Sequence, residues 1–213
     1  MRAIRRTAPD PDGLLTGIEI DDRDQPPPPD GWVTVTLRCA SVNHSDLAAI
    51  RGHGFDPAGS PRVLGSDGAG LDPDGNEVIV YPILAAARYP DPMHDPGLRM
   101  LSQGVDGTWA ERVQVPRANL VPKPPELTWE QAACLGTAWL TAYRMLFGRA
   151  RVSPGPSPAN SSARSSCAAT GEPRRAAPSA VRTVPESLLL PGGGARHLRL
   201  LNCHGLWTSR CGG

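Results

Sequence analysis

Residues 32–47 read WVTVTLRCASVNHSDL and carry the clearest pattern in this chain of 213 residues. Over residues 32–42 apolar and polar side chains alternate, which is typical of a strand with one buried face. Residues 45–50 predict one or two helical turns, because two glycines follow closely. We therefore expect the chain to pass from a strand into a short helix near Asn43. The apolar face of the strand consists of Val33, Val35, Leu37 and Cys39.

Shorter strands are expected on both sides of this segment. Residues 65–70 read GSDGAG, which predicts a strand edge that a ligand or another backbone segment can approach closely. The remaining strands are predicted at residues 1–6, 14–20, 77–81, 107–115 and 119–121.

The clearest helix is predicted over residues 128–147. Thr128 and Gln131 have the spacing of a capping box, in which each side chain bonds to the backbone of the other residue. Apolar residues recur at intervals of three and four, which is typical of a helix. They are Leu135, Ala138, Trp139, Ala142 and Tyr143.

Composition divides the chain near residue 150. Residues 1–150 hold 14 Lys and Arg and 19 Asp and Glu, whereas residues 151–213 hold 8 Arg, 2 Glu and no Ile, Phe or Tyr. The second part buries too little apolar surface to offset chain entropy. We therefore expect a mostly β unit with some α at residues 1–150 and a disordered tail at residues 151–213. The tail resembles the product of a reading-frame shift near Pro154 or of a natural truncation.

The whole chain has a formal net charge of +1, which does not favour nucleic acid or an anionic membrane as a partner. No run of about 18 apolar residues is present, so no membrane span is expected. The five cysteines do not form an even disulfide set, which favours a reduced, cytoplasmic protein.

Four stretches together resemble the N-terminal, GroES-like catalytic domain of the medium-chain dehydrogenase/reductase superfamily. They are ASVNHSDL at residues 40–47, VLGSDGAG at 63–70, DGTWAERVQVP at 106–116, and residues 127–143. The resemblance covers about residues 1–153 and implies a partly open β-barrel followed by an exit helix.

The resemblance also bears on zinc. Zinc alcohol dehydrogenases of the superfamily have Cys where this chain has Asn43, and Gly-His-Glu where it has residues 65–67. Amides and neutral hydroxyls are poor zinc ligands. The stretch that matches the structural-zinc lobe, residues 83–105, contains no Cys. We therefore expect no metal, and a similarity to the zinc-free branch of NADPH:quinone oxidoreductases and enoyl reductases.

In that branch hydride passes from the nicotinamide directly to the bound acceptor. The resemblance implies that Asn43 donates a hydrogen bond near the substrate oxygen, that Ser66 and Asp67 border the cleft, and that Thr141 approaches the nicotinamide. Simpler interpretations remain open: Asn43 caps the short helix, Asp67 braces the glycine turn, and Thr141 bonds to the preceding helical turn. We expect Trp109 to pack in or near the core.

The superfamily's dinucleotide-binding Rossmann domain would follow the exit helix, opening with a strand and a glycine-rich turn. Residues 156–162 read PSPANSS and cannot form a buried strand. The glycines at 192–194 lack the required spacing. We therefore expect the Rossmann domain to be missing.

The sequence thus predicts a fragment of a zinc-independent NAD(P)H-dependent oxidoreductase that is inactive in isolation. The family cofactor is NADP(H), which this chain is not expected to bind. Its partners would be a small-molecule carbonyl or quinone substrate, and either a second copy or a full-length relative. The alternatives are a non-catalytic GroES-like binding module and a zinc-dependent alcohol dehydrogenase domain.

Overall fold

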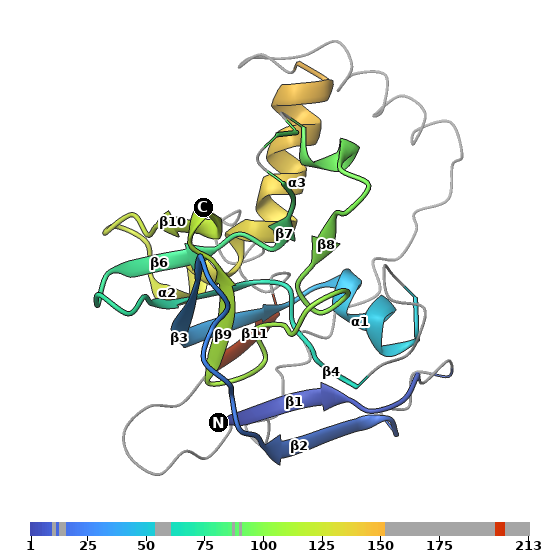
Figure 1. The fold of residues 1–213 in the computed structure, drawn as a ribbon. Coiled ribbons are helices and arrows are strands. Elements are labelled where there is room, and N and C mark those ends of the chain that lie inside the picture. The colour runs from blue at the N-terminus through green and yellow to red at the C-terminus, as the bar shows by residue number, and fades with distance from the viewer. Residues whose placement is uncertain are drawn as a thin grey trace, which may run out of the picture.

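The computed structural model describes residues 1–9, 12, 16–53, 61–86, 88–89 and 91–151, and the backbone of residues 199–202. Its longest strand is β3 (Trp32–Val42), where the sequence predicts it. The first half of β3 pairs antiparallel with β9 (Arg112–Pro116), and its second half pairs with β5 (Gly68–Leu71). Beyond β5 the sheet continues through β6 (Glu77–Val80) and β10 (Leu120–Pro122) (Figure 1).

A second, smaller sheet has β1 (Arg2–Arg6) between β2 (Ile18–Asp22) and β4 (Arg62–Val63). An isolated bridge between Ala3 and Ala110 connects this sheet to the segment that leads into β9. The two sheets therefore curl toward each other as a partly open barrel, which confirms the predicted fold class for the described residues.

Beside the barrel lies a short hairpin of β7 (Ile83–Leu84) and β8 (Arg99–Met100). The 3₁₀ turn η1 (Pro92–His94) lies between these two strands in the chain.

The core lies between the sheets. Val33, Val35 and Leu37 are buried along β3, whereas the alternating Thr34 and Thr36 are partly exposed. Cys39 is also buried, but the prediction that it shares a face with them is wrong. The register shifts between Leu37 and Cys39, so Cys39 clusters with Ala132 and Ala133 of α2 while Ala40 joins the main core.

Trp109 is 6% exposed, and its Nε1 donates to the carbonyl of Ser41 at 2.9 Å. This confirms its predicted packing role.

The predicted long helix is present but is not uniform. Thr128 Oγ1 accepts from the backbone N of Gln131 at 3.2 Å, and Gln131 Oε1 accepts from Thr128 N at 3.0 Å, which confirms the capping box. The helix then changes type along its length. The segments of the whole helical region are α2 (Trp129–Ala133), the π-helical η3 (Leu135–Trp139), α3 (Leu140–Tyr143) and the π-helical η4 (Arg144–Arg149). The last three segments, residues 135–149, are called the exit helix below.

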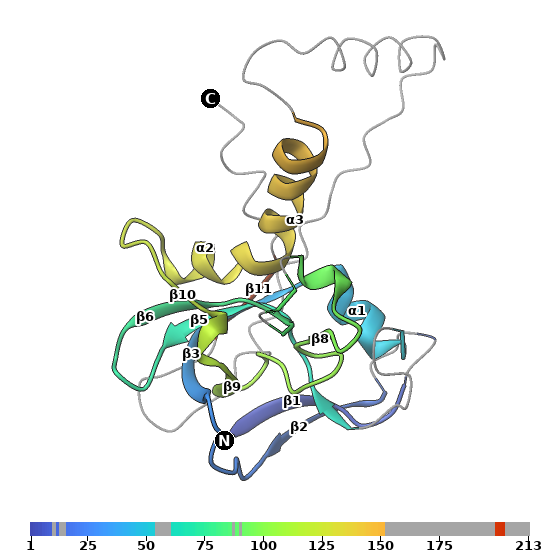
Figure 2. The ribbon, with the colours of Figure 1, turned by 45° about the horizontal axis from the view of Figure 1, so that its top comes forward.

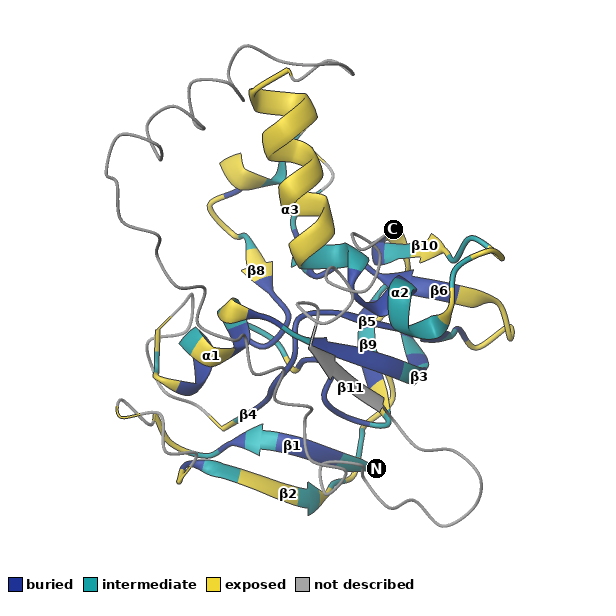
Figure 3. Ribbon diagram, turned by 180° about the vertical axis from the view of Figure 1, so that it is seen from behind, coloured by how far each residue is buried: buried dark blue, intermediate teal, exposed yellow. Residues whose placement is uncertain are grey.

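The exit helix projects from the barrel and packs only at its base (Figures 2 and 3). The predicted apolar stripe is therefore exposed over much of its length: Trp139 is 44% and Tyr143 63% exposed. Figure 3 shows this exposure along the helix, in contrast to the buried β3.

Two predicted strands have different bounds. The second strand runs from Ile18 to Asp22 rather than over residues 14–20. β9 begins only at Arg112, because the backbone NH groups of Gly107, Thr108 and Trp109 donate to the carbonyls of residues 63–65 instead of forming a regular ladder.

The structure also contains a strand that the sequence analysis does not predict. β11 (Arg199–Asn202) pairs parallel with residues 39–42 of β3. The rest of the tail, for which disorder is predicted, and the glycines at 192–194 lie outside the described residues. Among the described residues, no helix is long and apolar enough to cross a membrane.

Candidate functional site

A network of buried polar side chains lies where the barrel meets the exit helix, and Asp67 is at its centre. Asp67 precedes β5 and is fully buried. Its Oδ2 accepts from Asn43 Nδ2 at 2.9 Å and from the backbone N of Thr137 at 3.1 Å. Its Oδ1 accepts from Thr137 Oγ1 at 2.6 Å. Ser41 Oγ also donates to Oδ2, at 3.3 Å. One carboxyl group therefore links β3, the glycine turn and the exit helix.

This contact also explains the break in the predicted helix. Thr137 gives its backbone NH to Asp67 instead of to a carbonyl one turn earlier, a change often found at π-helical turns. Gly136 permits the close approach, because a Cβ at this position would lie 2.7 Å from Asp67 Oδ1.

A second buried carboxyl group, Asp46, lies in α1 (His44–Ile50). Its Oδ2 accepts from the backbone N of Asn43 at 2.8 Å, and its Oδ1 accepts from Ser66 Oγ at 2.7 Å. Ser66 Oγ is in turn 3.2 Å from Ser45 Oγ. A hydrogen-bonded chain thus runs from the fully buried Asp46 to the partly exposed Ser45.

Burial shifts the titration of both carboxyl groups. The pKa of Asp46 is raised from 3.8 to about 7, mainly by burial; the nearby charge of Asp67 adds to the rise, and hydrogen bonds from Ser66 and Asn43 oppose it. Burial also raises the pKa of Asp67, although hydrogen bonds from Thr137 and Asn43 oppose the shift. Within the described residues, neither group forms an ion pair with Lys, Arg or His. Asp46 is therefore able to hold a proton near neutral pH.

Three of the four predicted site residues meet in this network. Asn43 occupies the N-cap position of α1 with extended backbone, as the capping interpretation predicts. Its amide nitrogen donates both to Asp67 and, at 3.2 Å, to Ser41. Donation to a substrate would require one of these bonds to open, and this role stays a prediction. Ser66 and Asp67 are both fully buried, so their predicted roles at a cleft also stay predictions.

Thr141, the fourth predicted site residue, lies on the exit helix one turn beyond Thr137 and is exposed. It lines a groove of about 460 Å³ between the exit helix and the segments around η1 and the β7–β8 hairpin. Thr137 belongs both to the buried network and to the groove. The groove is lined by Tyr81, Pro82, Ile83, Met93, Leu98, Met100, Gly136, Thr137, Leu140, Thr141, Arg144, Met145 and Arg149.

The sequence analysis did not single out Asp46 or Thr137. Both have a signal that could have identified them. Asp46 stands three residues after Asn43, which is capping-box spacing. Thr137 stands four residues before Thr141 and so shares its helix face.

Asn43 and Ser66, which stand where zinc alcohol dehydrogenases are expected to have zinc ligands, both form hydrogen bonds within the network. Asn43 presents an amide nitrogen to Asp67, and the Ser66 hydroxyl donates to Asp46, so both are engaged as hydrogen-bond donors. Within the part of the chain that the structure describes, no three His, Cys, Asp or Glu side chains are grouped so as to hold a metal ion.

Comparison with known proteins adds the family. Residues 29–125 match the alcohol dehydrogenase GroES-like domain. The N-terminal part of this chain belongs to the medium-chain dehydrogenase/reductase superfamily. This confirms the resemblance predicted from the four sequence stretches.

Two curated proteins and one solved structure illustrate the range of relatives. The zinc-type alcohol dehydrogenase-like protein C337.11 of Schizosaccharomyces pombe is 32% identical over 146 residues, which are 68% of this chain and 42% of the relative. Crotonyl-CoA carboxylase/reductase of Cereibacter sphaeroides is 32% identical over 136 residues, which are 54% of this chain and 32% of the relative. A crystal structure of an NAD-dependent alcohol dehydrogenase has a TM-score of 0.65 and 33% identity, and the match covers 73% of this chain and 49% of that chain.

The GroES-like chain therefore spans about a third to two fifths of the curated relatives it matches, and about half of the solved structure. The relatives are oxidoreductases of the superfamily. Zinc is named for one of these relatives and not for the other two. Whether this chain binds zinc therefore has to be argued from its own residues.

Proposed function

We propose that residues 1–150 form the substrate-side domain of a zinc-independent, NAD(P)H-dependent oxidoreductase that reduces a small-molecule carbonyl compound or quinone. The observation that carries the proposal is the buried network, in which Asn43 donates to Asp67 and Ser66 bonds to Asp46, so that these side chains are engaged with one another. The groove beside it supplies a site of the size that small ligands use.

A nicotinamide cofactor supplies the hydride when it is bound. The residues of this chain would orient the reactants and handle the proton. Thr141 presents a hydroxyl on the groove, where it would contact the nicotinamide. Asp46 Oδ1 would hold a proton and then donate to Ser66 Oγ, which reverses the bond that the carboxylate accepts; the hydroxyls of Ser66 and Ser45 would thus offer a path for the proton out of the buried network.

The isolated chain is proposed to be inactive. Hydride transfer needs the nicotinamide within about 3–3.5 Å of its acceptor in a defined orientation. Residues 1–150 form the groove, but Thr141 is the single residue proposed to contact the cofactor. One hydroxyl contact contributes about 1 kcal/mol, far less than micromolar binding requires.

An NMR titration with NADPH tests this proposal. We expect shifts confined to residues around Thr137 and Thr141, with no saturation below millimolar NADPH, and their loss in Thr141→Arg. Phe147→Arg is the matched control, because Phe147 lies on the same helix but does not line the groove. Saturable binding at micromolar NADPH would refute the proposed inactivity, and an unchanged spectrum would refute the cofactor contact.

A second candidate function is a non-catalytic GroES-like binding module. It is favoured by the exposed apolar side chains on the exit helix that do not line the groove, namely Trp139, Tyr143, Leu146 and Phe147. They would contact a second copy of the chain or a full-length relative. Sedimentation analysis separates the candidates, because Tyr143→Glu would abolish association if this surface mediates it.

We also propose a cytoplasmic location, which the odd number of five cysteines favours because they do not form an even disulfide set.

A further inference from the structure

Methionine is concentrated in the groove. The chain has four methionines, and three of them, Met93, Met100 and Met145, line this one surface. They come from three separate elements, namely η1, β8 and the exit helix. Met93 is 60% and Met145 61% exposed. Because methionine is unbranched and polarizable, it adapts to apolar ligands of variable shape.

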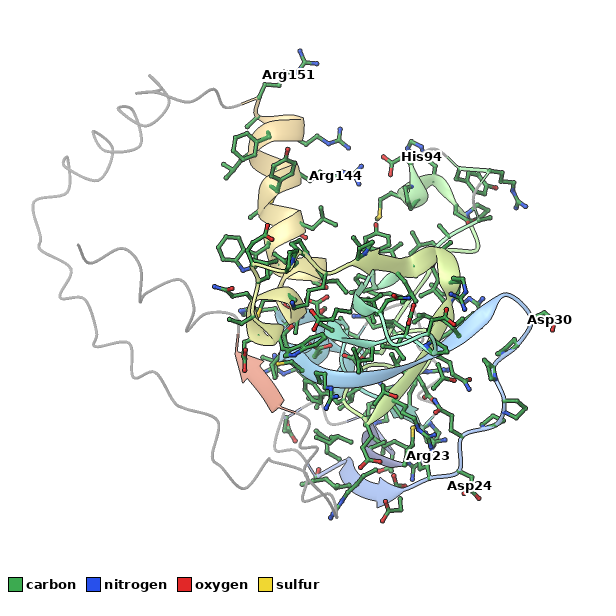
Figure 4. All side chains as sticks on the ribbon, turned by 90° about the vertical axis from the view of Figure 1, so that its left-hand side faces the viewer. Arg23, Asp24, Asp30, His94, Arg144 and Arg151 are labelled. Carbon is green, nitrogen blue, oxygen red and sulfur yellow. The ribbon has the colours of Figure 1, made fainter. Side chains whose placement is uncertain are left out.

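The groove also has an uneven distribution of charge. Arg144 Nη2 lies 2.8 Å from Asp91 Oδ2, so this guanidinium is already paired across the groove. Figure 4 shows Arg144 extending from the exit helix on the side of η1, where His94 is labelled. Arg149 lines the same groove and has no ion-pair partner among the described residues. This largely apolar groove therefore carries a positive charge that no carboxylate of the described residues neutralises.

We propose that this groove binds a flexible aliphatic chain with an anionic head group, with the methionines contacting the chain and Arg149 the head. The inference rests on the proposed function and narrows its substrate class: an acyl-type carbonyl compound is favoured over a planar quinone. The preference rests on the head group and on the flexibility of the chain, because a planar quinone without an acidic group offers no anion to Arg149, whereas unbranched methionine side chains adapt to an aliphatic chain.

The test uses the whole chain with its methionine methyl groups labelled with ¹³C, and octanoate as the probe. Met1 lies away from the groove and serves as the internal reference. We expect the signals of Met93, Met100 and Met145 to shift saturably at submillimolar octanoate while Met1 stays fixed. No shift up to 5 mM, or an equal shift of Met1, would overturn the proposal.

Variants separate the two parts of the site. Met145→Glu should weaken octanoate binding at least tenfold, because it places a carboxylate in the groove. Phe147→Glu puts the same charge on the same helix outside the groove and should leave binding unchanged. An equal loss in both variants would show general adsorption to an apolar helix and would refute the site.

The head group is tested by comparing ligands. Arg149→Gln should weaken octanoate and octyl phosphate about threefold, as for an exposed ion pair, and leave octanol unaffected. The preferred head group, carboxylate or phosphate, is the one that binds more tightly. Equal effects on octanol would refute the role of Arg149.

Menadione serves as the planar quinone, and its tighter binding than octanoate would refute the aliphatic preference. None of these measurements needs a cofactor or a metal, so their failure is separate from failure of the proposed function.

Discussion

Replacing Asp46 with Asn should stabilise the protein at neutral and alkaline pH. The pKa of Asp46 is raised from 3.8 to about 7 by burial, so the folded state binds more protons than the unfolded state between these values. The free energy of unfolding therefore falls as pH rises through this window. The full shift corresponds to about 4 kcal/mol, of which roughly 2–3 kcal/mol falls between pH 5 and pH 8.

Asn imitates the protonated carboxyl group, because its carbonyl oxygen can accept from Asn43 N and its amide can donate to Ser66 Oγ. Urea unfolding of both proteins at pH 5, 6, 7 and 8 gives the test. We expect the stability advantage of Asp46→Asn to grow by roughly 2–3 kcal/mol across this range. Asp30→Asn is the control, because Asp30 is exposed in the loop before β3 (Figure 4).

Between pH 5 and pH 8, the carboxyl groups with lowered pKa values stay ionised and do not contribute to the change in stability. Hydrogen bonds lower the pKa values of Asp72, Asp91 and Asp95, so their stabilising effect is lost only as pH falls below the ordinary Asp range. An advantage of Asp46→Asn that is constant from pH 5 to pH 8, or that shrinks, would refute the account of Asp46 as a buried, protonated group.

Two further predictions concern packing around the network. Thr137→Val should cost about 1.5–3 kcal/mol in urea unfolding, because it removes the hydroxyl that donates to the buried carboxyl group of Asp67; a change under 0.5 kcal/mol would contradict the link between barrel and helix. Gly65→Ala should cost at least about 3 kcal/mol, because Gly65 has φ +95° and a Cβ would overlap the Trp109 ring. Gly31→Ala is its control and should cost about 1 kcal/mol, because φ is +77° but no atom lies within 4 Å of the added Cβ; equal losses in both would contradict the packing argument.

The sequence predicts the parts of the fold that depend on local patterns. The alternation in residues 32–42 locates β3 and the buried face of its first half, and the Thr128–Gln131 spacing locates the start of α2. It does not predict the late start of β9, because residues 107–109 bond to residues 63–65, which are distant in the sequence. It also does not predict which face of the exit helix is covered, since apolar spacing indicates a stripe without indicating a partner.

The site shows the same division. Resemblance identifies Asn43, Ser66 and Asp67, and the structure brings them into one network. The contact between Asp67 and Thr137 joins residues 70 positions apart, and no local pattern reports it. The raised pKa of Asp46 likewise depends on burial by the whole barrel.

Zinc content tests the central claim most directly. The chain should be produced in zinc-supplemented medium, purified without chelator, and measured by mass spectrometry for zinc per chain. Because the Asn43 amide is engaged as a hydrogen-bond donor, the Ser66 hydroxyl is a poor zinc ligand and Asp67 already accepts four hydrogen bonds, the account predicts well under one tenth of a zinc ion per chain. One tightly bound zinc ion per chain, lost in Asp67→Asn, would contradict it.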